Sequence, residues 1–227
     1  MKKYKYLLVD ADDTVFDFLA CESAAIGAVL ARYKLPHDRK TVSAYSAINL
    51  KYWKAFERGE IARESIFEGR FKEFLALLGS DIEPLKINAD YFKELSNQAV
   101  LMPGALQTLE YLSKKYRVFI TTNGVTATQI KRTKASGVAD LVEKIYISED
   151  IGVQKPSAEY FDFVVNDIGE RDRSRYLVIG DSLTSDILGG INAGIDTLWV
   201  NARGNPPAKD IQPTYTADTF EDLQKML

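Results

Sequence analysis

From about residue 105 onward, the chain alternates between short apolar runs and longer stretches in which apolar residues recur every three or four positions. The short runs, which are typical of β-strands, lie at residues 117–121, 144–147, 175–179 and 197–200. The longer stretches, which are typical of helices, lie at residues 105–115, 126–136, 158–168 and 184–193. Strands separated by helices of this length are joined by right-handed crossovers into a parallel sheet. The pattern therefore predicts an α/β domain.

The first hundred or so residues have a different pattern. A β-prone run at residues 4–9 predicts one more strand of the same sheet. Apolar residues then recur three and four apart from about residue 17 to residue 98, with Gly and Pro between the periodic segments, which predicts about four helices and no strand. We expect a Rossmann-like parallel sheet core that is interrupted after its first strand by an inserted helical cap domain.

The predicted domain boundaries follow from this change of pattern. The core domain comprises residues 1–16 and 101–227, and the cap domain comprises residues 17–100. Near the end of the chain, Thr219 and Asp222 can cap a last amphipathic helix.

The composition excludes several classes of protein. Of the 227 residues, 29 are Lys or Arg and 32 are Asp or Glu, so there is no basic surplus with which to bind nucleic acid. The longest apolar stretch, residues 24–31, is far shorter than the roughly 18 to 20 residues that cross a bilayer. We expect a cytoplasmic protein, a monomer or weak homodimer, with no nucleic-acid or membrane partner.

Polar residues lie in the segments that follow four of the predicted strands. In an open parallel sheet, ligands bind at the carboxyl ends of the strands, so these residues are expected to meet at one edge. In chain order they are Asp10, Asp12, Asp13 and Thr14, then Thr122, Asn123 and Gly124, then a turn over residues 150–156 that contains Lys155 and Pro156, and last Gly180, Asp181 and Asp186.

This set has the donors for a metal ion and a phosphate group. A single cysteine and a single histidine exclude an intrachain disulfide and a histidine-rich metal site, so a metal must be held by carboxylates. Asp10 and Asp181 offer the hard oxygen ligands that suit Mg²⁺. Thr122, Lys155 and the amides at the start of the helix near residue 126 can donate to a phosphate dianion. Each string alone is a weak signal, because all of these residues are common in turns.

Taken in order, the four strings resemble the four motifs of the haloacid dehalogenase (HAD) superfamily. The strings are residues 10–14, residues 120–124, Lys155 with Pro156, and Gly180-Asp181 with Asp186. The resemblance covers essentially the whole chain, since the helical region resembles that family's first-position cap. Position 13, usually glycine in the family, is Asp13 here, and the pattern gives no role for its charge.

The resemblance implies a role for each residue. Asp10 would be the nucleophile and Asp12 the general acid and base. The implied phosphate ligands are Thr122, Asn123 and Lys155, and the implied Mg²⁺ ligands are Asp10, Asp12 and Asp181, with Asp186 in the outer coordination shell.

The residue types suit phosphoryl transfer through a covalent intermediate. A phosphate dianion repels a carboxylate, so attack by Asp10 needs Mg²⁺ and Lys155 to neutralise charge. The attack would give an aspartyl-phosphate, which divides one difficult displacement into two easier ones. Asp12 would protonate the leaving alkoxide and then take a proton from water.

A narrower resemblance concerns the substrate. Residues 10–17, 69–71, 147–156 and 185–194 are similar to the pyrimidine 5′-nucleotidase branch of the superfamily. This implies hydrolysis of nucleoside 5′-monophosphates such as dUMP, dTMP and UMP, which are small phosphomonoesters.

Several alternatives remain at this point. A sugar-phosphate phosphatase or a phosphomutase would carry the same motifs, because these motifs do not encode specificity. A non-enzymatic phospho-receiver module has similar residues at its strand ends but would not need the inserted cap. Asn49, Arg63 and Arg70 in the insert could recognise a base or sugar, and an exposed helix face explains them equally well.

Overall fold

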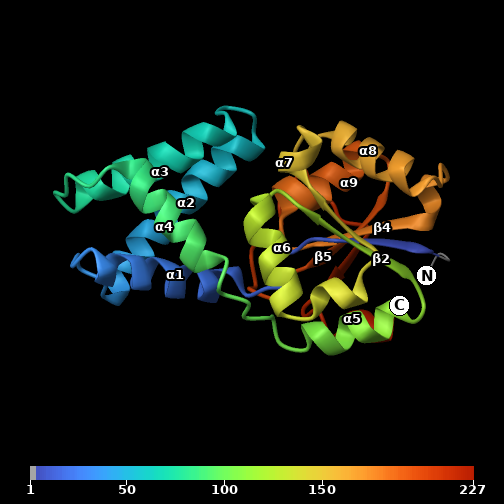
Figure 1. The fold of residues 1–227 in the computed structure, drawn as a ribbon. Helices are drawn as coiled ribbons and strands as arrows, with labels where there is room; N and C mark the ends of the chain where they lie inside the picture. Colours follow the sequence, from blue (N-terminus) through green and yellow to red (C-terminus); the bar gives the residue numbers. More distant parts are fainter. Residues whose placement is uncertain (1–3) are drawn as a thin grey trace. The chain divides into compact units, whose positions relative to one another are not determined.

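The computed structural model describes residues 4–227, which divide into two compact units (Figure 1). One unit contains the chain up to Asp17 and from Val100 onward, and the other unit, the helical insert, is Phe18–Ala99. Residues 1–3 of the predicted core domain lie outside the described residues.

The first unit is built on a parallel sheet that has, within residues 4–227, six strands in the order β3-β2-β1-β4-β5-β6. The strands are β1 (Tyr6–Val9), β2 (Arg117–Thr122), β3 (Lys144–Ile147), β4 (Tyr176–Gly180), β5 (Asp196–Val200) and β6 (Tyr215–Ala217). The predicted α/β fold class is confirmed. The sequence pattern does not predict β6, because its three residues are too few to show an alternation.

The helices of this unit follow the predicted order, with two differences. They are α5 (Ala105–Ser113), α6 (Thr126–Ala135), α7 (Ser148–Ile151), α8 (Ala158–Ile168), α9 (Leu188–Asn192) and α10 (Leu223–Met226). The turn predicted after β3 begins instead with the short helix α7. The single helix predicted over 184–193 is wrong in its first half, where the chain forms a π-helical turn, Leu183–Ile187, before α9. Such turns are frequent at functional sites.

Helices cover both faces of the sheet, with α8 and α9 on one side of the strands and α5 on the other (Figure 1). On the α8 side, Tyr160, Phe161 and Val164 join Leu8 and Val178 of the central strands in one buried cluster. Burial on both faces explains why these strands are apolar without alternation.

The register of the central strands determines where the polar residues emerge. Val9, the last residue of β1, lies beside Ile120 of β2 and Ile179 of β4. The residues that follow these three positions therefore leave the sheet at the same edge.

The insert contains four helices within residues 18–99, in agreement with the prediction. They are α1 (Phe18–Arg32), α2 (Arg39–Glu57), α3 (Arg63–Leu77) and α4 (Pro84–Leu95). Their apolar faces meet in a core that includes Ile26, Tyr45, Phe71 and Tyr91. Across residues 4–227, no helix combines the length and apolar character that a bilayer crossing requires.

The two connections to the insert lie side by side in the first unit. The main-chain N–H of Asp17 donates to the carbonyl of Val100 at 3.0 Å. Phe16 and Leu101 form an antiparallel bridge next to this hydrogen bond.

A buried polar chain crosses the core of the insert. Asn49 donates to Glu22 at 2.6 Å and accepts from Arg70 at 2.6 Å, and Arg70 also donates to Asn88 at 2.7 Å. Arg70 is only 1% exposed. The interpretation that Asn49 and Arg70 lie on an exposed helix face is therefore wrong.

Replacing Asn49 by Ala should destabilise the protein, because buried Glu22 and Arg70 each lose a hydrogen bond. We expect the free energy of unfolding to fall by roughly 2 to 4 kcal/mol, as measured by urea denaturation. Lys72→Ala, at an exposed position in the same insert, should change it by less than about 0.5 kcal/mol. Equal effects of the two variants would contradict a stabilising role for the polar chain.

Candidate active site

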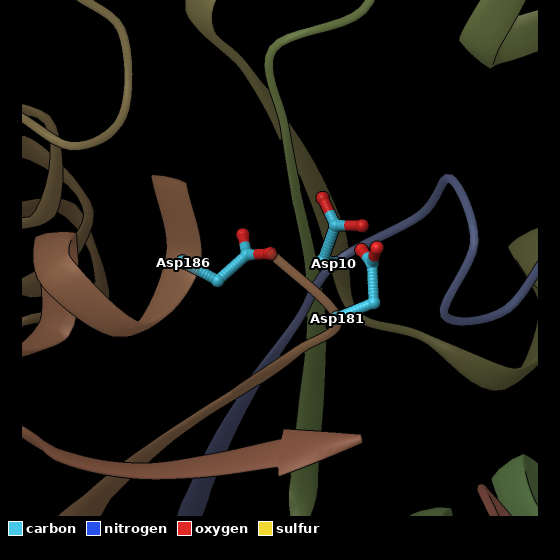
Figure 2. A group of neighbouring side chains, drawn as sticks. All are labelled: Asp10, Asp181 and Asp186. Atoms are coloured by element: carbon cyan, nitrogen blue, oxygen red, sulfur yellow. The ribbon is translucent and has the colours of Figure 1, made fainter. Parts of the chain in front are cut away.

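Three carboxylates meet at the carboxyl end of the central strands. Asp10 directly follows β1, Asp181 directly follows β4, and Asp186 lies in the π-helical turn. One oxygen of each lies within 4.8 Å of the others, and Figure 2 shows the three side chains converging. Asp10 and Asp186 are buried and Asp181 is half-buried.

The ammonium group of Lys155 lies among these carboxylates. It donates to Asp10 Oδ1 at 2.7 Å, to Asp186 Oδ1 at 2.5 Å and to the carbonyl of Thr121 at 2.7 Å. Its three protons are all used in these bonds. One cation faces three carboxylates, so the cluster keeps a surplus of negative charge.

Burial and charge act in opposite directions on the ionisation of this cluster. Burial, followed by the charge of Asp186, raises the pKa of Asp10 to about 8 against the attraction of Lys155. Burial alone would lower the pKa of Lys155, but the attraction of Asp10 and Asp186 outweighs burial and raises it. Lys155 therefore stays protonated near neutral pH.

Gly180 leaves the space that Asp186 occupies. A Cβ atom at position 180 would lie 2.3 Å from the Asp186 carboxyl carbon. Oδ2 of Asp186 accepts from the main-chain N–H of Ser182 at 3.1 Å, and Oδ1 accepts from Lys155. Because both of its oxygens accept hydrogen bonds from the protein, Asp186 is better placed to orient Lys155 than to ligate a metal directly.

Thr122 and Asn123 follow β2 at the same edge. The buried hydroxyl oxygen of Thr122 accepts from the main-chain N–H of Gly124 at 3.0 Å. The Asn123 side chain donates to the carbonyl of Lys155 at 2.9 Å and accepts from its N–H at 3.0 Å. Asn123 thus holds the Lys155 main chain in place, while its contact with phosphate stays a prediction.

The start of α6 differs from the expected row of open amides. The main-chain N–H of Thr126 donates to Glu149 at 2.7 Å, and the Thr126 hydroxyl donates to Asp150 at 2.8 Å. The carboxylate of Glu149 therefore occupies one of the amides that the sequence assigned to phosphate.

Asp12 has two partners that the sequence analysis does not identify. Arg132 donates to Oδ1 and Gln129 donates to Oδ2, each at 2.6 Å. The sequence feature that could have pointed to these partners is the composition of α6. This helix has few apolar residues, so it must bury polar ones against the sheet.

The charge of Asp13, for which the motif pattern has no role, is paired with Arg203, whose Nη2 lies 2.5 Å from Asp13 Oδ1. Arg203 also contacts Asp17 at 2.8 Å. Asp13 has φ of 60°, a left-handed conformation that glycine adopts most easily and Asp tolerates better than most residues.

The donor set suits a hard divalent cation. The ligand atoms offered by Asp10 and Asp181 are carboxylate oxygens, as Mg²⁺ prefers, and with Asp186 beside them the surplus negative charge favours a bound cation. Burial, followed by the charge of Asp186, raises the pKa of Asp10, and a cation bound beside this carboxyl group would lower it.

Known proteins resemble this chain over nearly its whole length. The haloacid dehalogenase-like hydrolase family model matches residues 4–194. The HAD-hydrolase YfnB of Bacillus subtilis (strain 168) is 37% identical over 100% of this chain and 97% of its own. The pyrimidine 5′-nucleotidase YjjG of Escherichia coli (strain K12) is 32% identical over 99% of this chain and 98% of its own. The pyrimidine 5′-nucleotidase PynA of Streptococcus pneumoniae (strain ATCC BAA-255 / R6) is 33% identical over 97% of this chain and 93% of its own.

A solved structure agrees with these matches. The crystal structure of YfnB from Bacillus subtilis bound to magnesium has a TM-score of 0.95 and 36% identity, covering 100% of this chain and 99% of that one. With the family model and the full-length relatives, this confirms the resemblance carried by the four motifs: the chain belongs to the haloacid dehalogenase-like hydrolases.

Proposed function

We propose that the protein is a Mg²⁺-dependent phosphatase that hydrolyses nucleoside 5′-monophosphates of the dUMP, dTMP and UMP type through an aspartyl-phosphate. The observation that carries this proposal is the Asp10 carboxylate, which is held by buried Lys155 beside the carboxylate of Asp181. The names of the full-length relatives YjjG and PynA support the pyrimidine nucleotide as substrate.

The metal would be held by residues of the acidic cluster. Asp10 and Asp181 would bind Mg²⁺ through their carboxylates and Asp12 through its main-chain carbonyl, with Asp186 in the outer coordination shell. Bound there, Mg²⁺ supplies positive charge that neutralises the phosphate oxygens.

The protein's own groups divide the remaining work. Asp10 attacks phosphorus, while Lys155 neutralises charge on the transferring group and orients the Asp10 carboxylate. Thr122 and Asn123 would position the phosphate. Asp12 would give its proton to the leaving 5′-oxygen and later take one from the attacking water.

A sugar-phosphate phosphatase or a phosphomutase is the alternative within the same chemistry, since the motifs do not encode the substrate. A phosphomutase would return the phosphate to the sugar, whereas a phosphatase releases it. The cytoplasmic location and the state of monomer or weak homodimer stay predictions.

Phosphate release with Mg²⁺ should favour pyrimidine nucleotides. In a panel of dUMP, dTMP, UMP, dCMP, dAMP, dGMP and sugar phosphates, we expect dUMP and dTMP to exceed the purine nucleotides by at least about tenfold in kcat/KM. Asp10→Asn serves as the blank and should release almost no phosphate. A preference for sugar phosphates would refute the nucleotide assignment, and wild-type turnover by Asp10→Asn would refute the covalent route.

Removing the proposed acid should leave a slow enzyme. Asp12→Ala should lower kcat on the best nucleotide by about 10² to 10⁴ fold, because the leaving alkoxide then departs without a proton. The control is Asp140→Asn, which changes an exposed carboxylate that is not part of the acidic cluster and should keep the wild-type kcat. An Asp12→Ala enzyme as fast as Asp140→Asn would exclude Asp12 as the acid.

Mg²⁺ binding should release protons between about pH 6 and about pH 8. The pKa of Asp10 in the metal-free protein is raised to about 8, so this carboxyl carries a proton below that pH. A metal ligand must be ionised, so the Mg²⁺ affinity should fall by up to about tenfold for each pH unit below the pKa. Calorimetry in two buffers of different ionisation enthalpy measures the protons released.

The control for this titration is again Asp140→Asn, which should release the same number of protons as the wild type. Mg²⁺ binding with no proton release and an affinity independent of pH would contradict the raised pKa of Asp10.

A further inference from the structure

Helix α6 holds the Asp12 carboxylate by both of its oxygens. Arg132 Nη1 donates to Oδ1 and Gln129 Nε2 donates to Oδ2, each at 2.6 Å. Gln129 and Arg132 are three residues apart, so they lie on one face of the helix. Two hydrogen bonds from one rigid element leave the carboxyl group little freedom to rotate.

Both donors are themselves fixed by burial. The Arg132 side chain is 0% exposed, whereas that of Asp12 is 27% exposed and so reaches solvent. The guanidinium of Arg132 also lies over the ring of Phe16, 4.4 Å from its centroid. A buried guanidinium is costly unless it is paired, so this one is held tightly against its carboxylate.

Gln129 connects Asp12 with the loop after β2. Its Nε2 atom also lies 3.4 Å from the hydroxyl oxygen of Thr122. A Cβ atom at Gly124 would lie 2.3 Å from the same Nε2 atom, so only glycine leaves room for the amide there. The spacing between Asp12 and Thr122 is therefore maintained by one buried amide.

We propose that Arg132 and Gln129 are positioning residues for Asp12, which fix the direction of its carboxyl group relative to Thr122. This inference rests on the phosphatase function proposed above. Proton transfer requires the acid to lie within hydrogen-bond reach of the leaving oxygen, and a carboxyl group that rotates freely is out of reach for most of the time.

The choice of leaving group separates positioning from a general structural role. A nucleoside alkoxide is a poor leaving group and needs the proton from Asp12. The p-nitrophenolate ion is stable without a proton, so p-nitrophenyl phosphate depends much less on the acid. Damage to the whole site would slow both esters, whereas misplacement of Asp12 slows mainly the nucleotide.

The test compares Arg132→Met and Gln129→Leu with the wild type on both esters. We expect kcat to fall by roughly 10 to 100 fold on the best nucleotide and by less than about threefold on p-nitrophenyl phosphate, with KM nearly unchanged. Arg132→Lys should restore part of the loss. Lys134→Met, which removes a positive charge from the exposed side of α6, should leave both rates unchanged.

A double-mutant cycle shows whether these residues act through Asp12. In the Asp12→Ala background, Arg132→Met should cause no further change in the ratio of the two rates, because the group that it positions is gone. Thermal melting of every variant identifies those that fail to fold. If Arg132→Met does not fold, the rates of Gln129→Leu on the two esters test the positioning role, since this variant removes only one uncharged donor.

Two different failures can be told apart. A wild-type enzyme that hydrolyses no phosphomonoester would overturn the proposed function and this inference with it. A wild-type enzyme that hydrolyses both esters, with folded variants that lose both activities equally or keep both, would overturn the positioning role alone.

Discussion

The buried ammonium of Lys155 is the interaction on which the site depends. It joins Asp10 after β1, the Thr121 carbonyl in β2 and Asp186 in the π-helical turn, which are far apart in the sequence. Because a buried charge is costly without partners, each of these groups is held where the cation needs it. Asn123 holds the main chain of Lys155, and Gly180 leaves the space that Asp186 occupies. Both residues therefore help to keep the Lys155 ammonium group and its partners together.

The sequence predicts the helices and strands wherever burial gives the apolar residues a regular spacing along the chain. The bounds of β3 and α8 agree with the apolar pattern to the residue, because each element buries a run of apolar residues. The three-residue strand β6 leaves no such pattern. The π-helical turn over Leu183–Ile187 depends on the carboxylate of Asp186, which must reach both Ser182 and Lys155, and no local propensity encodes that requirement.

The candidate site is predictable in part for a related reason. Parallel strands bring their carboxyl ends together, so Asp10, Thr122 and Asp181 could be collected from strand ends alone. The partners of Asp12 could not, because Gln129 and Arg132 lie 117 and 120 positions away and their contact depends on how α6 is rotated. The pairing of Asp13 with Arg203, 190 positions apart, has the same origin.

The paired connections of the insert bear on how the family could diversify. Because Asp17 and Val100 are joined by a main-chain hydrogen bond, the chain leaves and re-enters the first unit at adjacent points. A segment attached in this way can be exchanged for one of different length without altering the register of the sheet. Evolution or design could therefore replace the insert, and with it any selectivity that it confers, while the polar groups at the strand ends stay in place.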